Sequence, residues 1–245
     1  MKQNKYDEST FFNEYSRMPR STGGLEAAGE WPELRRMIPD LKDKSVLDLG
    51  CGYGWHCRYA EEQGATYVLG IDISAKMLER ARALTDHQHI EYRRAAIEDL
   101  SVSDESFEVV ISSLAIHYIE DFKQLCHKVH QILTPDGHFV FSVEHPMFTA
   151  LAAQDFYYDT EGTKLHWPVD NYHLEGIREA DFLGHTVMKY HRTVSTYVNE
   201  LLSAGFQLTR LSELKPTPEM LRSSPAYEEE LRRPMFMLIS AVKKQ

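Results

Sequence analysis

The feature that most constrains this chain is a glycine-rich turn directly after a short apolar segment. Residues 46–54 read Val-Leu-Asp-Leu-Gly-Cys-Gly-Tyr-Gly, and a helical pattern begins at Trp55. Glycines at this spacing allow a tight turn and let a ligand approach the backbone closely. The following helix points its amino-terminal end at such a ligand. Three glycines in five residues are more than a simple turn requires, so the pattern predicts a strand, a turn and a helix that together bind a ligand.

The spacing of these glycines separates two classes of cofactor. The dinucleotide fingerprint G-x-G-x-x-G would place its third glycine at position 55, but this chain has Trp55 there and a glycine at 54. An acidic residue, Asp72, ends the next expected strand 22 residues after Gly50, where a carboxylate can bind ribose hydroxyls. The spacing therefore disfavours a dinucleotide dehydrogenase, which stays the weaker alternative.

Strand and helix patterns alternate through the centre of the chain. Helices are expected at 55–63, after a Ser74 cap, after an Asp121 cap, and at 193–204. We expect strands at 45–49, 66–71, 90–97, 107–113, 138–143, 206–211 and 235–242. This alternation predicts a parallel sheet covered by helices on both sides. The last two strands are close enough in sequence to pair antiparallel.

Four segments together resemble the class I S-adenosylmethionine (SAM)-dependent methyltransferases, in particular the small soluble type 11 group. They are VLDLGCGYGWH (46–56), LGIDISAKMLERAR (69–82), RAAIEDL with FEVVISSLAIHYIED (94–100 and 107–121), and LTPDGHFVFSVEHP (133–146). The resemblance implies an α/β, Rossmann-like fold with a seven-stranded, mostly parallel sheet and an antiparallel last strand. It divides the chain into an N-terminal helical cap (1–40), a SAM-binding domain (41–145 and 193–245) and an inserted substrate cap (146–192).

The resemblance also implies which residues contact SAM, whose product is S-adenosyl-L-homocysteine (SAH). Asp48 and Gly50 match the positions that hold the methionine end of SAM. Gly52 and Gly54 match the glycines that let the cofactor approach the backbone closely. Asp72 matches the ribose-binding acid. The remaining matched positions surround the adenine, the ribose and the sulfonium; they are Ile73, Met77, Ile97, Glu98, Ser112 and Leu114.

Further candidates come from residue type and location. In the N-terminal segment, Arg20 could pair with the SAM carboxylate and Tyr15 could hydrogen-bond it. His117 and His145 each follow a strand, at the edge where open α/β sheets bind ligands. Either is a candidate general base if the acceptor must lose a proton, and either could instead be a packed or capping histidine. Glu144 is a further candidate base or an orienting partner.

The expected activity is transfer of a methyl group to a small molecule, on O, N or C, by in-line displacement. Two alternatives stay open: a methyltransferase acting on protein or RNA, and a SAM-binding protein without turnover. A net charge of −10 disfavours nucleic acid as a partner. The aromatic-rich insertion 146–192 predicts either an acceptor pocket or a structural or dimer-forming excursion, so a homodimer is compatible with it.

Other sequence patterns concern the location of the protein, metal binding and a charged surface segment. Few cysteines and no signal peptide predict a cytoplasmic location. No apolar run reaches the roughly 18 residues of a membrane span. His127 and His130 share a helical face without an evident third ligand, so no metal site is expected. The charged segment at 228–233 is expected to be solvated.

Overall fold

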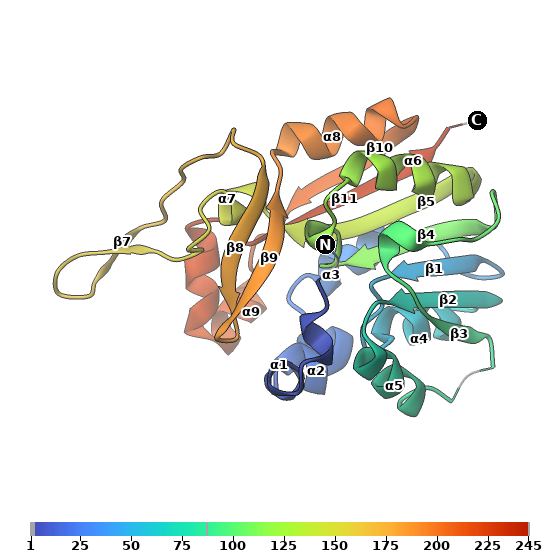
Figure 1. The fold of residues 1–245 in the computed structure, drawn as a ribbon, viewed down its shortest axis with the longest axis horizontal. Coiled ribbons are helices and arrows are strands. Elements are labelled where there is room, and N and C mark those ends of the chain that lie inside the picture. The colour runs from blue at the N-terminus through green and yellow to red at the C-terminus, as the bar shows by residue number, and fades with distance from the viewer. Residues whose placement is uncertain (1–2, 87, 245) are drawn as a thin grey trace.

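The computed structural model describes residues 3–86 and 88–244 and contains a seven-stranded sheet (Figure 1). Its order is β10-β11-β5-β4-β1-β2-β3, and β11 runs antiparallel to both of its neighbours. The other pairings are parallel. This arrangement confirms the predicted sheet. Its strands are β1 (Ser45–Leu49), β2 (Tyr67–Asp72), β3 (Ile90–Arg94), β4 (Phe107–Ser113), β5 (Leu133–Glu144), β10 (Phe206–Glu213) and β11 (Phe236–Lys243).

Helices cover both faces of the sheet because successive strand residues point to opposite sides. Leu47 and Leu49 pack with α6 (Phe122–Ile132) and α8 (Val194–Ser203) on one face. Val46 packs into a second cluster with α4 on the other face. The helices on this second face are α3 (Trp31–Met37), α4 (Trp55–Glu62) and α5 (Ala75–Ala83) (Figure 1). Burial of each large apolar side chain stabilises the fold by about 1.5–3 kcal/mol.

The predicted helix caps are present, whereas one predicted strand is too long. Ser74 accepts the Met77 amide at 3.1 Å, and Asp121 accepts the Gln124 amide at 2.8 Å. The third strand, expected at 90–97, ends at Arg94 because its neighbour β2 ends at Asp72, the last paired position. A 3-10 turn at Ile97–Asp99 follows.

The N-terminal region divides into two parts with different roles. Residues up to 30 include α1 (Ser9–Tyr15) and α2 (Pro19–Thr22). The helix α3 instead packs Trp31 and Leu34 against Val140 and Leu238 of the sheet. The boundary expected at residue 40 is therefore too late, because α3 belongs to the core of the sheet domain.

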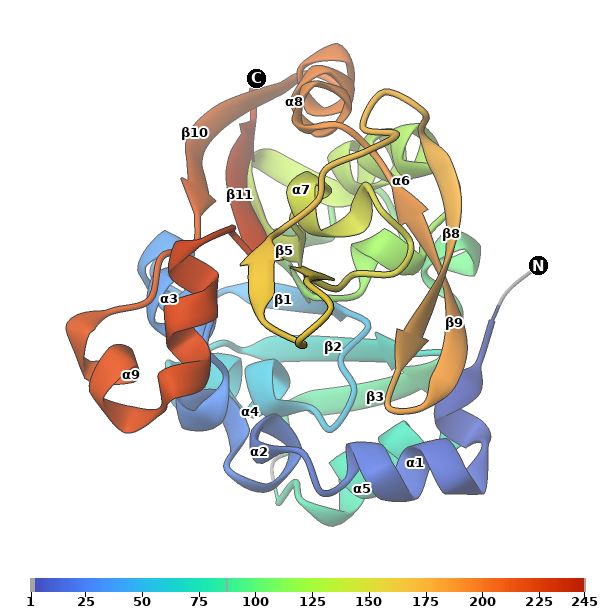
Figure 2. The ribbon, with the colours of Figure 1, turned by 90° about the vertical axis from the view of Figure 1, so that its left-hand side faces the viewer.

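The insertion contains a short helix and two hairpins. Its elements are α7 (Pro146–Thr149), β6 (Tyr157–Tyr158), β7 (Lys164–His166), β8 (Gly176–Phe182) and β9 (His185–His191). Phe11 of α1 packs against Ala180 and Val187 of the β8–β9 hairpin. The two segments are far apart in sequence, yet they form one layer in front of the sheet (Figure 2). A C-terminal helix, α9 (Pro218–Ser223), packs with the 3-10 turn Pro225–Leu231.

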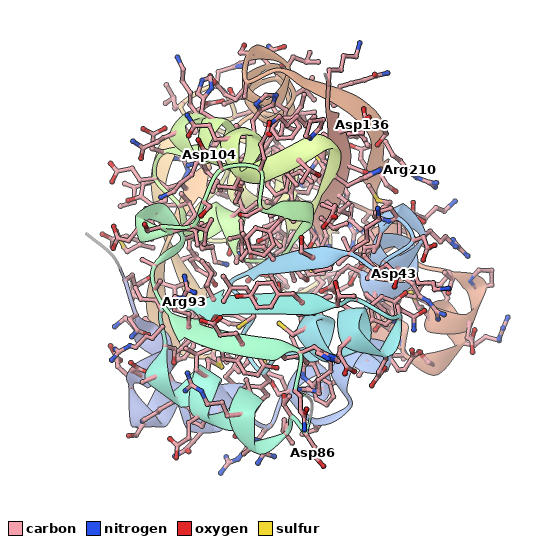
Figure 3. All side chains as sticks on the ribbon, turned by 90° about the vertical axis from the view of Figure 1, so that its right-hand side faces the viewer. Asp43, Asp86, Arg93, Asp104, Asp136 and Arg210 are labelled. Carbon is pink, nitrogen blue, oxygen red and sulfur yellow. The ribbon has the colours of Figure 1, made fainter. Side chains whose placement is uncertain are left out.

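The opposite end of the sheet carries connections at the amino-terminal ends of the parallel strands. Asp43, Asp104 and Asp136 lie on this side, away from the insertion (Figure 3). No helix among the described residues has both the length and the apolar character needed to cross a lipid bilayer.

Candidate active site

A cavity of about 530 Å³ opens at the carboxyl ends of the parallel strands. Its volume is within the range of about 300–1,000 Å³ typical of small-molecule sites. The glycine turn, the ends of β2, β4 and β5, the N-terminal segment, the insertion and residues 214–236 all contribute to its wall. The cavity therefore lies where ligands bind in open α/β sheets.

The three glycines of the turn have different roles. Gly50 and Gly52 line the cavity with φ of +75° and +53°, a region that side chains rarely adopt. A Cβ on Gly52 would meet nothing within 4 Å, so this face is open to a ligand. Gly54 does not line the cavity; a Cβ there would lie 2.0 Å from the Tyr92 hydroxyl. In this structure the glycine therefore allows close packing against Tyr92.

The carboxylate of Asp72 lines the cavity and is fixed by the backbone. It accepts the Gly52 amide at 2.9 Å and the Ser74 amide at 2.8 Å. Burial raises the pKa of Asp72 to about 6, although these two amides act in the opposite direction. Each oxygen retains lone pairs toward the cavity, as ribose hydroxyl donors require.

An apolar slot continues from Asp72 along the cavity wall. Ile73, Met77 and Ile97 line it, together with Glu98. Leu114 lines the cavity at the end of β4 with φ of +52°, a conformation that its amide stabilises by donating to the Ser142 carbonyl at 3.0 Å. These five predicted residues come from the segment that begins α5, the 3-10 turn Ile97–Asp99 and the end of β4.

Like Gly54, two further predicted cofactor residues lie outside the cavity wall. Asp48 is buried beneath the turn because its position in β1 faces α4, where it accepts the Cys57 thiol at 3.3 Å. Burial raises the pKa of Asp48 to about 7. Ser112 is also buried, and its hydroxyl donates to the Leu49 carbonyl at 2.8 Å. The next residue, Ser113, lines the cavity instead.

The N-terminal segment places Tyr15 and Arg20 on the cavity wall. Arg20 forms an ion pair with Glu30, which the sequence analysis did not single out. Glu30 is 2% exposed, accepts the Ser113 hydroxyl at 3.2 Å, and has an oxygen, Oε2, without a partner among the described residues. The pair presents a cation and an anion side by side, as a zwitterionic amino-acid group requires.

A buried polar network forms the other end of the cavity. Lys189 donates to Glu144 at 2.7 Å, and Gln154 donates to the second Glu144 oxygen at 3.1 Å. His117 is 3% exposed and its Nδ1 accepts the Glu144 amide at 3.4 Å. Burial lowers the pKa of His117 to about 4, so the ring is neutral at pH 7. Lys189 and Gln154 lie in the insertion, where sequence pattern gave no signal for them.

His145 is a structural histidine. Its ring lies outside the cavity wall and is 2% exposed. Nδ1 accepts the Met147 amide at 3.0 Å, which caps α7, and Nε2 lies 2.9 Å from a Glu213 oxygen. Both ring nitrogens are engaged, so the prediction of His145 as a base is not supported, and its capping alternative describes the geometry.

The charged segment at 228–233 is only partly solvated. Glu230 lines the cavity, and burial raises its pKa. Arg233 is buried against two aromatic rings, with its guanidinium carbon 4.6 Å from the Trp167 centroid and 5.0 Å from that of Phe148. The segment therefore helps to close the site. The described residues contain no cluster of three or more potential metal ligands.

These features fit SAM. The open face of Gly52, the Asp72 carboxylate, the apolar slot and the Arg20–Glu30 pair match the backbone approach, ribose, adenine and amino-acid portions of the cofactor. The partnerless Glu30 oxygen is the clearest sign of a cationic ligand group, because a buried acceptor without a partner costs about 1–3 kcal/mol.

Comparisons with known proteins agree with this geometry. The methyltransferase domain family matches residues 47–141. A solved SAM-dependent methyltransferase from Mesorhizobium loti is 48% identical, with a TM-score of 0.85, over 90% of this chain and 100% of that one. An uncharacterized protein of Haemophilus influenzae is 33% identical over 97% of this chain and 96% of its own length. The chain belongs to the class I SAM-dependent methyltransferases. Within that class it is a member of the type 11 group.

A further match covers a smaller part of the chain. The ubiquinone biosynthesis O-methyltransferase of Neisseria meningitidis serogroup C is 36% identical over 107 residues, which are 42% of this chain and 45% of that protein. The match therefore spans less than half of either protein.

Proposed function

We propose that this methyltransferase transfers a methyl group to a small molecule held in the same cavity as the cofactor. One observation carries the proposal: Asp72 and Gly52 on the cofactor side and His117 and Lys189 on the far side line one cavity. The α1 segment, the β8–β9 hairpin and residues 214–236 enclose it. A site of this size and enclosure suits a metabolite, whereas a macromolecule would need an open groove.

Different residues of the cavity would bind different parts of SAM. Bound SAM supplies a methyl group on a positively charged sulfur. Asp72 would hold the ribose, Ile73 and Ile97 would flank the adenine, and Arg20 with Glu30 would hold the amino-acid end. Residues 3–30 and 146–192 would together act as a cap that aligns the acceptor and excludes water.

The charge of the protein favours a small molecule over RNA as the methyl acceptor. The chain has a net charge of −10, and acidic residues outnumber basic ones on the cavity wall. Phosphate backbones need clustered lysine and arginine. The ubiquinone O-methyltransferase relative acts, by its name, in the biosynthesis of a small molecule, which is consistent with the proposal.

The test is methyl transfer from isotope-labelled SAM into fractions of a bacterial extract. We expect label in the low-molecular-weight fraction, identified by mass spectrometry, and none above background in protein or RNA. An Asp72→Ala variant serves as the control for transfer that depends on the cofactor site. Label confined to protein or RNA would contradict the proposal, and no label in any fraction would favour a SAM-binding protein without turnover.

A further inference from the structure

The acceptor end of the cavity contains a lysine whose position is fixed by its neighbours. Lys189 is 2% exposed and lines the cavity from β9. Its ammonium donates to Glu144 at 2.7 Å and to the Gln154 side-chain oxygen at 3.0 Å. An ammonium has three N–H donors, so one is left beyond these two bonds. A buried lysine on a cavity wall with an unused donor is suited to an oxygen of a ligand.

His117 supplies a second donor beside this lysine. Its Nδ1 accepts the backbone amide of Glu144, so the proton of the neutral ring resides on Nε2. The ring lines the cavity and lies next to Tyr118, with centroids 4.4 Å apart. His117 therefore offers an N–H and no free basic nitrogen, which makes it a donor to the acceptor and not a general base.

The same network leaves little to bind an amine. The charge of Glu144 is already paired with that of Lys189, and its second oxygen accepts a hydrogen bond from Gln154. The other acids near this end are peripheral: Asp181 is exposed beside the hairpin turn, and Glu230 is held near the positive charge of Arg233. Apolar walls complete the end of the cavity, from Ile119, Phe148, Phe182 and Val187.

We propose that the methyl acceptor is an oxygen acid bound in its ionised form, a phenolate, enolate or carboxylate, with its oxygen held by Lys189 Nζ and His117 Nε2. The inference rests on the proposed function and names the class of its substrate. The oxygen lone pair forms the C–O bond while the C–S bond breaks, and its electrons return to sulfur. The negative oxygen and the positive sulfur both become neutral, so no proton moves and no base is required.

Binding of 4-nitrophenol to the SAH-saturated protein tests this, because its phenolate and phenol differ in visible absorption. The titration is done at a pH below the pKa of the free phenol. We expect the phenolate band to appear on binding. Lys189→Met should weaken phenolate binding at least tenfold, and His117→Phe should weaken it less. The matched control is Lys164→Met, a lysine of the same insertion that does not line the cavity.

Lys189→Met leaves the Glu144 charge unpaired, which destabilises the fold, so a second variant is needed to separate loss of binding from loss of structure. The double change Lys189→Met with Glu144→Gln removes both charges and should also lose the phenolate band. If 4-nitrobenzoate displaces the bound 4-nitrophenolate, the acceptor is a carboxylate. If it does not, the acceptor is a phenolate or an enolate. Stronger binding of protonated 4-nitrobenzylamine, or no phenolate band and no 4-nitrobenzoate binding, overturns the inference. Methyl transfer to amines in the extract assay would do so while leaving the small-molecule function intact.

Discussion

Asp7 accepts the hydroxyl of Ser74 at 2.7 Å and thereby attaches the N-terminal segment to the start of α5. The same Asp7 oxygen accepts the Lys76 amide at 3.1 Å, and Ser74 in turn caps the Met77 amide. Both residues therefore satisfy backbone donors of one helix terminus, where a negative charge is also favoured. Because α5 begins three residues after Asp72, the N-terminal segment is attached at the cofactor end of β2.

Loss of this attachment should loosen the cofactor. In Asp7→Ala, we expect SAH to dissociate several-fold faster, because the adjacent Tyr6 lines the cavity and would lose its anchor. The hydrogen bonds that Asp7 accepts at the start of α5 are worth about 1 kcal/mol, so the protein should still fold. Stopped-flow displacement of SAH measures the rate. Asp104→Ala, at the opposite end of the sheet (Figure 3), is the control. Equal dissociation rates in the two variants would show that Asp7 does not hold the segment.

Cofactor binding should depend on the ionisation of Asp72. Burial raises its pKa to about 6 in the free protein, and an ionised carboxylate is the better acceptor for ribose hydroxyls. SAH affinity should therefore be constant above pH 6 and fall below it, by at most tenfold per pH unit. Calorimetry across this range measures the effect. In Asp72→Asn the affinity should be weaker and independent of pH; an unchanged pH profile in that variant would assign the titration to another group.

The same pKa has an opposite consequence for stability of the free protein. An unfolded aspartate has a pKa of about 3.9, so the folded state binds the proton more tightly than the unfolded chain. The contribution of Asp72 to the free energy of unfolding should therefore increase as the pH falls from about 6 toward about 4. Bound SAH should reduce this gain, because it favours the ionised form.

The sequence predicted the parts of the site that are encoded locally. Gly50, Gly52 and Asp72 follow strands whose apolar patterns are short and distinct, and all three line the cavity. Two other predicted cofactor residues lie in the core and not on the cavity wall. Asp48 lies two residues before Gly50 and Ser112 directly before Ser113 of the wall, but the alternation of their strands turns their side chains into the core.

The residues that were missed share one property. Glu30 and Lys189 are charged residues that the fold buries at the site, and each contacts a residue far away in sequence, Ser113 and Glu144 respectively. Lys189 belongs to a hairpin whose alternation of exposed and buried residues gives no sign that a charge lies inward. Their positions follow from how the caps pack on the sheet, which depends on tertiary contacts such as that between Phe11 and Val187.

His145 should matter for stability and not for turnover. Its Nδ1 satisfies the Met147 amide at the start of α7, so His145→Ala should lower the free energy of unfolding by about 1 kcal/mol. An asparagine at this position can also accept the amide, and His145→Asn should recover part of the loss. Denaturant unfolding measures both variants. A large fall in kcat with unchanged SAH binding and unchanged stability would restore His145 as a catalytic residue.

Gly54 tests whether the third glycine of the turn acts through packing. In Gly54→Ala, a Cβ would meet the Tyr92 hydroxyl at 2.0 Å, and the φ of +72° alone costs about 1–2 kcal/mol for a residue with a side chain. We expect a larger loss of stability than that backbone cost. Replacing Tyr92 with alanine in the same chain removes the clash but not the backbone strain. If packing is the reason for this glycine, the double variant should lose less stability than the sum of the two single changes, as thermal unfolding can measure. Additive losses would instead mean that the backbone conformation alone requires glycine at this position.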